Sequence, residues 1–224
     1  MAKLVRFTFN HFGTNCYILH EESGAALIID PCFTSEKEAS QLTDYITKHN
    51  LAPQMVALTH PHPDHIGGVA FVKRHYNIPL AMHAADGELL AVAPAYGAQM
   101  GFMIEPLEAD IDLATTTLLE VGSMRIEAIH TPGHSKGGVC FYNAEEGILI
   151  SGDTLFAGSI GRSDLPGGDY DELMRSIMEK ILPLGGGVKV FPGHGGDTTI
   201  GQEIGTNPFI GEVLDGGFNK DTTL

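Results

Sequence analysis

Residues 59–65 constrain the fold of this chain more than any other stretch. They read Thr-His-Pro-His-Pro-Asp-His and follow an apolar run, residues 55–59, that has the length and composition of a β-strand. Imidazole nitrogens and carboxylate oxygens are the ligands that divalent cations of borderline softness bind. A surface turn is the alternative, but so stiff and ligand-rich a loop has no evident packing purpose. The stretch therefore predicts a metal site after a strand, with these potential ligands: His60, His62, Asp64 and His65.

The two prolines of this stretch exclude a regular helix across the loop and favour extended backbone before each of them. In extended backbone, side chains at alternate positions share a face. We therefore expect His60, His62 and Asp64 to converge on one point, while His65 turns toward a second.

Composition and charge reduce the number of function classes that this chain could belong to. The chain has 224 residues, 43% of them hydrophobic, so it can bury a substantial core. A formal net charge of -15 without a basic cluster argues against a nucleic-acid surface. No signal peptide or membrane-spanning run is visible, which predicts a cytoplasmic protein with no membrane partner. Cys16, Cys32 and Cys140 are widely spaced and are expected to be buried free thiols.

Hydrophobic patterning predicts two similar halves, each of strands followed by a helix, packed face to face in one domain over residues 1–224. The chain opens with an antiparallel meander, not with a nucleotide-binding crossover. Pro and Gly interrupt residues 93–113, which form either a flap over a pocket or a long packed connection. The expected strands are 3–9, 15–20, 25–29, 55–59, 78–82, 124–130, 138–142, 147–150 and 188–191, and the expected helices are 35–49, one opening at 66–72, 84–92 and 169–182.

Three later strand ends each run into a glycine-containing turn that carries one more potential ligand: His134, Asp153 and His194. Any one of these turns alone is a weak signal, since a single histidine after a Pro-Gly turn is more often structural. Together with the first loop they supply five histidines and two aspartates, which is enough for two cations. Loops at one edge of a rigid sheet scaffold are where proteins place such sites.

These residues at these spacings resemble the metallo-β-lactamase fold over essentially the whole chain. The resemblance implies an α+β, four-layer αβ/βα sandwich with the site at the edge between its two sheets. It also implies two divalent cations, with zinc expected and iron or manganese as alternatives. An aspartate at 153, where the best-known class of lactamases carries cysteine, argues against penicillin-type substrates. The matching positions place His60, His62 and His134 on one metal and Asp64, His65 and His194 on the second, with Asp153 bridging both.

Within that superfamily, residues 152–156 and 161–164 resemble the glyoxalase II group, and most closely its short bacterial hydroxyacylglutathione hydrolase-like members. Full-length glyoxalase II has an added C-terminal helical domain, which we expect this chain to lack because it ends about 30 residues after His194. Arg162 matches a lysine of the group's glutathione-contacting pattern and keeps its charge. Asp164 and Gly196 stand where that pattern has two tyrosines, so glutathione contacts are altered.

The resemblance implies a hydroxide shared by two cations that attacks an acyl carbonyl. Asp64 would support it as ligand and hydrogen-bond acceptor. A thiolate leaves without a general acid, so we expect a small acyl thioester as the substrate. Arg162 would bind a substrate carboxylate; a surface ion pair with Asp164 or Asp169 is the alternative.

Two other functions stay open. A persulfide dioxygenase of the same scaffold holds a single iron through the equivalents of His60, His134 and Asp153, and a non-enzymatic metal-binding scaffold for a partner is the third hypothesis. His130 could orient a ligand imidazole from outside the cluster. The other histidines are interpreted as structural or solvated: His11, His20, His49, His75 and His83.

Overall fold

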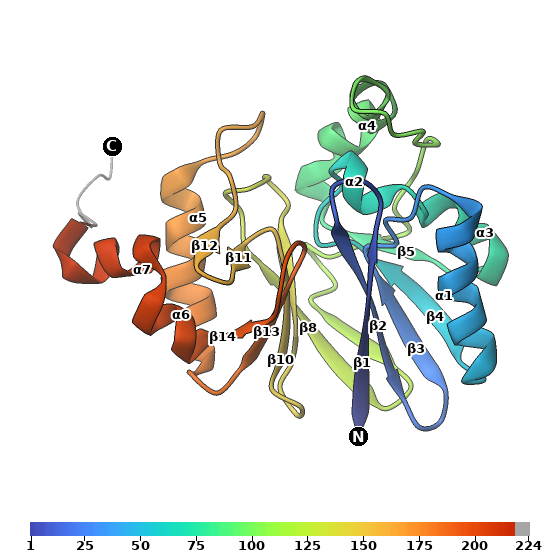
Figure 1. Cartoon of the computed structure of the whole chain (residues 1–224), viewed down its shortest axis with the longest axis horizontal. Helices are drawn as coiled ribbons and strands as arrows, with labels where there is room; N and C mark the ends of the chain where they lie inside the picture. Colours follow the sequence, from blue (N-terminus) through green and yellow to red (C-terminus); the bar gives the residue numbers. More distant parts are fainter. Residues whose placement is uncertain (218–224) are drawn as a thin grey trace.

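Two six-stranded β-sheets pack face to face in the computed structural model, which describes residues 1–217, and helices cover the outer face of each sheet (Figure 1). The first sheet runs in chain order through β1 (Ala2–Phe9), β2 (Thr14–Glu21), β3 (Ala25–Ile29), β4 (Ala52–Ala57), β5 (Leu80–Met82) and β6 (Ile111–Asp112). The second sheet has the order β14 (Thr198–Thr199), β13 (Lys189–Pro192), β10 (Ile148–Gly152), β9 (Val139–Asn143), β8 (Met124–His130) and β7 (Leu118–Val121).

Alternation along the inner strands builds a core on both sides of each sheet. Ile18 and Ile28 pair across β2 and β3 and pack under the helices, whereas Leu19 and Leu27 pair on the opposite face, between the sheets. Because neighbouring side chains point to opposite faces, strands buried on both faces need a continuous apolar run. The four-layer αβ/βα sandwich is confirmed.

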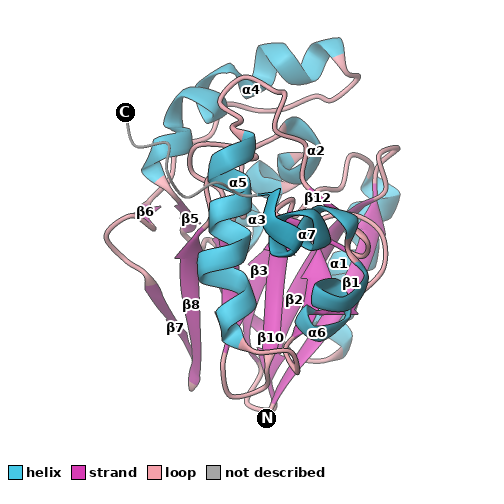
Figure 2. Cartoon of the chain, turned by 90° about the vertical axis from the view of Figure 1, so that its left-hand side faces the viewer, coloured by secondary structure: helices cyan, strands magenta, loops and turns pink. Residues whose placement is uncertain are grey.

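The outer layers differ in their helices (Figure 2). The first sheet is covered by α1 (Glu36–Lys48) and α3 (Val69–Tyr76), after the single turn α2 (Pro63–Ile66). The second sheet is covered by α5 (Tyr170–Ser176), the π-helical turn η2 (Ile177–Ile181), α6 (Ile200–Thr206) and α7 (Pro208–Glu212). The remaining elements are η1 (Ala84–Asp86), α4 (Gly87–Gln99), the hairpin β11 (Leu155–Phe156) and β12 (Ser159–Ile160), η3 (Leu182–Leu184) and η4 (Val213–Gly217).

Several boundaries differ from the sequence-based expectation. β4 begins at Ala52 and includes Pro53, which is accommodated where the pairing with β3 shifts register. The helix expected at 84–92 continues as α4 through Pro94 to Gln99. Its buried face, which includes Leu90 and Ala93, keeps the helix packed despite the hydrogen bond that proline removes. The hairpin β11–β12, β14, α6 and α7 were not predicted.

Residues 93–113 form a packed connection whose first turns belong to α4. Phe102 is buried and its ring lies 5.3 Å from that of Phe12, between ring centroids. Ile104 and Leu107 pack against the core under the first sheet. The three cysteines are buried free thiols, as predicted. Within residues 1–217, no helix is both long enough and apolar enough to cross a membrane.

Candidate metal centre

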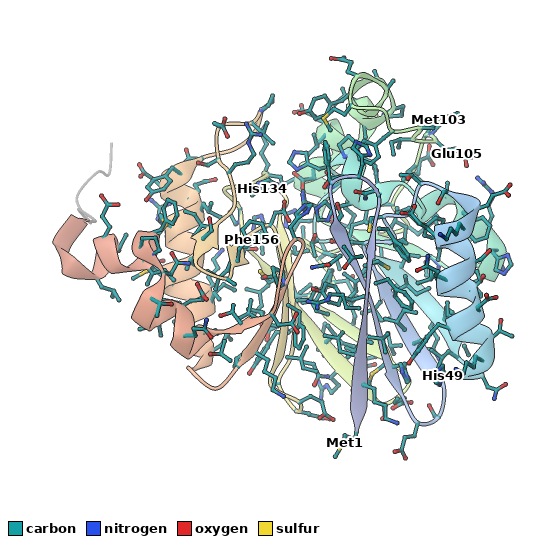
Figure 3. All side chains as sticks on the ribbon, viewed as in Figure 1. Met1, His49, Met103, Glu105, His134 and Phe156 are labelled. Atoms are coloured by element: carbon teal, nitrogen blue, oxygen red, sulfur yellow. The ribbon has the colours of Figure 1, made fainter. Side chains whose placement is uncertain are left out.

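Four loops meet at one edge of the sandwich, and each follows a strand: β4, β8, β10 and β13. In Figure 3, His134 lies at this edge, between the two halves of the molecule. The first sheet also holds the loop after β13 in place. The Asn15 amide nitrogen donates to the Gly193 carbonyl oxygen at 2.7 Å, and the Tyr17 hydroxyl donates to the Pro192 carbonyl oxygen at 2.7 Å. The loops therefore converge because the two sheets are hydrogen-bonded to each other here.

The first group of candidate ligands consists of three imidazoles. Nε2 of His134 lies 3.1 Å from Nε2 of His60 and 2.9 Å from Nδ1 of His62. All three rings are buried. Nitrogens that share one tetrahedral zinc ion at 2.0–2.1 Å stand roughly 3.3 Å apart, so the spacing fits a single small cation.

The second group consists of Asp64, His65 and His194. Oδ2 of Asp64 lies 3.2 Å from Nε2 of His194 and 3.6 Å from Nε2 of His65. The extended-loop geometry was wrong about Asp64, which it had placed beside His60 and His62, whereas the family resemblance had placed it with His65 and His194. α2 begins at Pro63, and a proline at the first helical position is compatible with a helix start, so Asp64 and His65 lie on a helical turn and point the same way.

Asp153 lies between the two groups. Its Oδ1 is 3.4 Å from Nε2 of His65, and its Oδ2 is 3.7 Å from Nε2 of His134 and 3.6 Å from Nε2 of His194. One carboxylate thus reaches ring nitrogens of both groups. All seven residues that the sequence singled out as ligands are brought together.

Two polar atoms in this cluster have no hydrogen-bond partner among the described residues: Nε2 of His65 and Oδ1 of Asp153, both fully buried. Leaving a buried polar atom unsatisfied costs about 1–3 kcal/mol, and more when the group is charged. A divalent cation between them would satisfy both atoms. The chemistry of the donor set therefore fits a bound metal.

Burial and neighbouring rings keep two imidazoles of the first group, those of His60 and His62, in the neutral form. Burial, together with the neighbouring rings of His65 and His134, lowers the pKa of His60 well below its ordinary value. Burial and His134 lower the pKa of His62 to about 3. A neutral imidazole is the form that binds a metal ion, so no proton has to be displaced from these two rings.

The second group is ion-paired. Burial opposes the charge of the Asp64 and Asp153 carboxylates, but the neighbouring rings, His65 first and then His194 and others, together outweigh burial and lower both pKa values. The same contacts act in reverse on the rings. Burial opposes protonation of His65 and His194, but the two carboxylates outweigh it and raise both pKa values. A cation binding here would replace two protonated rings as the partner of the carboxylates.

An outer ring of hydrogen bonds fixes which nitrogen of each ligand ring faces inward. Nδ1 of His65 lies 2.9 Å from Oδ2 of Asp30, and Nδ1 of His134 lies 2.7 Å from the carbonyl oxygen of Arg162. Asp30 also accepts from the Thr59 amide at 2.8 Å and from the Thr59 hydroxyl at 2.6 Å. Hydrogen bonds of this kind set ligand orientation and basicity in metal sites.

Sequence reasoning missed Asp30 and chose His130 for that role. His130 instead has Nε2 2.9 Å from the Lys136 carbonyl oxygen, and its ring stacks on His83 at 4.0 Å between centroids. The available signal for Asp30 was a carboxylate at the end of β3, which pairs in parallel with β4, the strand that leads into the ligand loop.

Position 193 requires glycine because the Asp153 carboxylate lies very close to its Cα. A Cβ at this position would overlap Oδ1 of Asp153 and stand 2.8 Å from Cε1 of His65. The Pro-Gly-His turn that the sequence showed after β13 therefore leaves room for the Asp153 carboxylate.

The cluster forms the floor of a pocket of about 350 Å³. Arg162 lies on its rim, where Nε and one Nη each donate to Asp164 at 2.8 Å. Of the two ion pairs considered from sequence, the structure contains the one with Asp164, whereas Asp169 caps α5. The pocket is lined by Phe12, His62, Asp64, Tyr96, Met100, His134, Asp153, Arg162, Leu165 and His194.

The four-layer sandwich, the histidine–aspartate cluster at its edge and the relatives described next together support a metal-dependent hydrolase. The chain belongs to the metallo-beta-lactamase superfamily, whose family pattern matches residues 10–194. It is 34% identical over 202 residues to the Haemophilus influenzae hydroxyacylglutathione hydrolase GloC, and the match covers 89% of this chain and 93% of that one.

Two solved structures are similar over nearly their whole length. The crystal structure of BLEG-1 B3 metallo-beta-lactamase superposes with a TM-score of 0.85 at 37% identity and covers 93% of this chain and 99% of that one. The crystal structure of TTHA1623 in a di-iron-bound form superposes with a TM-score of 0.81 at 34% identity. The match covers 92% of this chain and 99% of that one.

Proposed function

We propose that the protein is a binuclear metallohydrolase that cleaves acyl thioesters. The observation that carries the proposal is the position of Asp153, whose carboxylate reaches one ring of the first group and two of the second while its Oδ1 is buried with no hydrogen-bond partner in residues 1–217. We assign His60, His62 and His134 to one cation, Asp64, His65 and His194 to the other, and Asp153 to both.

Two bound divalent cations would supply a water activated near neutral pH and positive charge opposite a developing oxyanion. Asp64 would orient that water. Its Oδ2 is held by the Thr14 hydroxyl at 3.0 Å, and its lowered pKa keeps it an acceptor. His60 and His62 are neutral, so their ring nitrogens can bind a cation without losing a proton. The hydrogen bond from His65 to Asp30 keeps Nε2 of His65 turned toward the cluster.

A thioester suits the pocket because its leaving group needs no proton. A thiol has a pKa of roughly 8.5, so the thiolate is a stable product near neutral pH. Outside the proposed ligand set, the polar side chains among the described pocket residues are Tyr96 and Arg162. Arg162 is the cation we propose for binding an anionic group of the thiol carrier. The similarity to the H. influenzae GloC supports a glutathione thioester as the first substrate to test.

β-Lactam hydrolysis is the second candidate, because a structure named a B3 metallo-beta-lactamase is 37% identical to this chain. Cleavage of an amide requires a proton for the departing nitrogen. Tyr96, which lines the same pocket, is the group to which we would assign that proton.

The test combines metal analysis with a substrate panel. Purified protein is analysed for zinc, iron and manganese, then assayed on S-lactoylglutathione, other acyl thioesters and a chromogenic cephalosporin. Two metal equivalents and thioester hydrolysis that a chelator abolishes are expected. Cephalosporin hydrolysis without thioester hydrolysis would select the second candidate. One iron per chain with oxygen uptake on glutathione persulfide would replace both with the dioxygenase.

A further inference from the structure

Helix α4 lines two neighbouring pockets with one of its faces. Tyr96 and Met100 line the pocket over the candidate metal centre, and Leu89 and Val92 line a second pocket of about 230 Å³. The four positions follow one another at intervals of three or four residues, so they lie along a single stripe of the helix. Val92 is 53% exposed, although it is a large apolar side chain.

The opposite wall is also shared. Arg162 and Leu165 line the pocket over the metal centre, and the next residues, Pro166 and Gly167, line the second pocket. The floor is equally continuous, since His134 belongs to the first pocket and its neighbour Ser135 to the second. In Figure 3, His134 lies between α4 and the loop that precedes α5. The two pockets are therefore consecutive parts of one groove that begins at the metal centre.

The lining of the second pocket is mostly apolar. Among the described residues that line it, the buried charge of Asp86 has both oxygens engaged: Oδ2 accepts from the Ser135 hydroxyl at 2.7 Å, and Oδ1 from the Gly137 amide at 2.7 Å. Lys136 pairs with Glu88 at 3.4 Å, between the loop and α4. Leu89, Val92 and Pro166 supply apolar surface that a polar glutathione moiety would not cover well.

On the basis of the thioester hydrolase function proposed above, we propose that this groove binds the acyl chain of the substrate, and that the preferred substrates carry an extended apolar acyl group rather than a short hydroxyacyl group. The carbonyl carbon lies at the metal centre and the chain runs along α4 from Met100 toward Leu89. At about 1.5 Å per residue, this part of the helix is roughly 16 Å long, which accommodates an acyl chain of medium length. Leu89 and Val92 are the residues that determine chain-length specificity.

The experiment is a chain-length series on the metal-loaded protein. Thioesters of one thiol, N-acetylcysteamine, carry acetyl, butyryl, hexanoyl or octanoyl groups, and kcat/KM is measured for each. Burying one methylene is worth up to about a factor of four, so kcat/KM is expected to rise at least ~10-fold from acetyl to octanoyl in a groove open on one side. A flat or falling series would overturn the proposal.

Substitutions on α4 test the assignment of residues. Val92→Asp is expected to lower the octanoyl-to-acetyl ratio of kcat/KM about tenfold, because a charge would have to be desolvated beside the chain. Val92→Thr, which keeps the side-chain shape, should lower the ratio by a smaller factor. Ala91→Asp is the matched control, since Ala91 is exposed on the same helix and lines neither pocket. Equal ratios in Val92→Asp and Ala91→Asp would contradict the proposal.

A binding measurement separates this inference from the function on which it rests. If no thioester is cleaved, the thioesterase proposal fails, and the groove is judged by calorimetry with octanoate and acetate. Octanoate that binds at least ~10-fold more tightly than acetate to the wild type, but not to Val92→Asp, supports an acyl-chain groove. Equal affinities for the two acids would rule it out.

Discussion

The carboxylate of Asp30 lies 2.9 Å from Nδ1 of His65, on the side of the ring turned away from the candidate metal centre, although the two residues are 35 positions apart. The same carboxylate accepts two hydrogen bonds from Thr59, the residue that opens the ligand loop. Asp30 therefore positions both a ligand and the loop that carries it, without reaching the metal itself.

Replacing Asp30 tests this positioning role. Asp30→Asn removes the charge that holds the Nδ1 proton of His65, so affinity for the second metal and hydrolytic activity should each fall about 10–100-fold. Affinity is measured by chelator competition, and circular dichroism reports folding. Asp44→Asn, an exposed change on α1, is the control and should match the wild type. Unchanged metal affinity in Asp30→Asn would refute the role.

Asp153→Ala should abolish hydrolysis and leave the protein folded with less than two metal equivalents. The loss of activity should exceed the ~10–100-fold expected for Asp30→Asn, a residue that only orients a ligand, since the Asp153 carboxylate is proposed to bind both cations. Activity and metal content are measured on the same preparation. Full activity would remove the bridging role of Asp153.

Gly193→Ala should reproduce the effect of Asp153→Ala without touching a ligand. The added methyl group would overlap Oδ1 of Asp153, so the carboxylate has to move away from His65. Gly196→Ala is the matched control, because a Cβ there would meet no heavy atom of the described residues within 4 Å. Metal content is the readout. Two bound metals in Gly193→Ala would show that the close approach is not required.

The stabilisation that metal gives should grow as the pH rises. The pKa values of His65 and His194 are raised in the folded, metal-free protein. Their protonation therefore contributes stability below the unfolded value of about 6.5, and this contribution is lost as pH rises through the raised pKa values. A metal must displace the same protons, so its affinity falls toward low pH. The increase in Tm that saturating zinc causes should grow from pH 5 to pH 9. A constant increase across this range would contradict the prediction.

Arg162→Ala should raise KM for an anionic thioester such as S-lactoylglutathione with little change in kcat, because the guanidinium is proposed to contact the carrier and not the reacting carbonyl. Stability should be little changed, since the pair with Asp164 is exposed. Arg74→Ala is the control: Arg74 makes the same two-point ion pair with Glu105, away from the pocket. An equal KM in both variants would exclude Arg162 from substrate binding.

Inner strands such as β3 and β10 were predictable because burial on both faces requires an apolar run, and both strands have one. The boundaries that failed depend on context. Pro94 was interpreted as a break, but a helix face packed against the core tolerates it. The elements after β13 have short apolar stretches, and packing against the second sheet orders them.

The amino-acid sequence alone determined which side chains could bind metal and which strand ends carry them, because residue chemistry and strand periodicity are local properties. Loop geometry argued from the residues alone misplaced Asp64, and tertiary structure decided its position, with His65 and His194 as the family resemblance had implied. Pro63 starts a helical turn that moves Asp64 from the side of His62 to that of His65. The tertiary structure also places Asp30 behind His65 and α4 opposite the loop after Arg162. These contacts join segments far apart in the chain, and their geometry depends on how the two sheets and α4 pack.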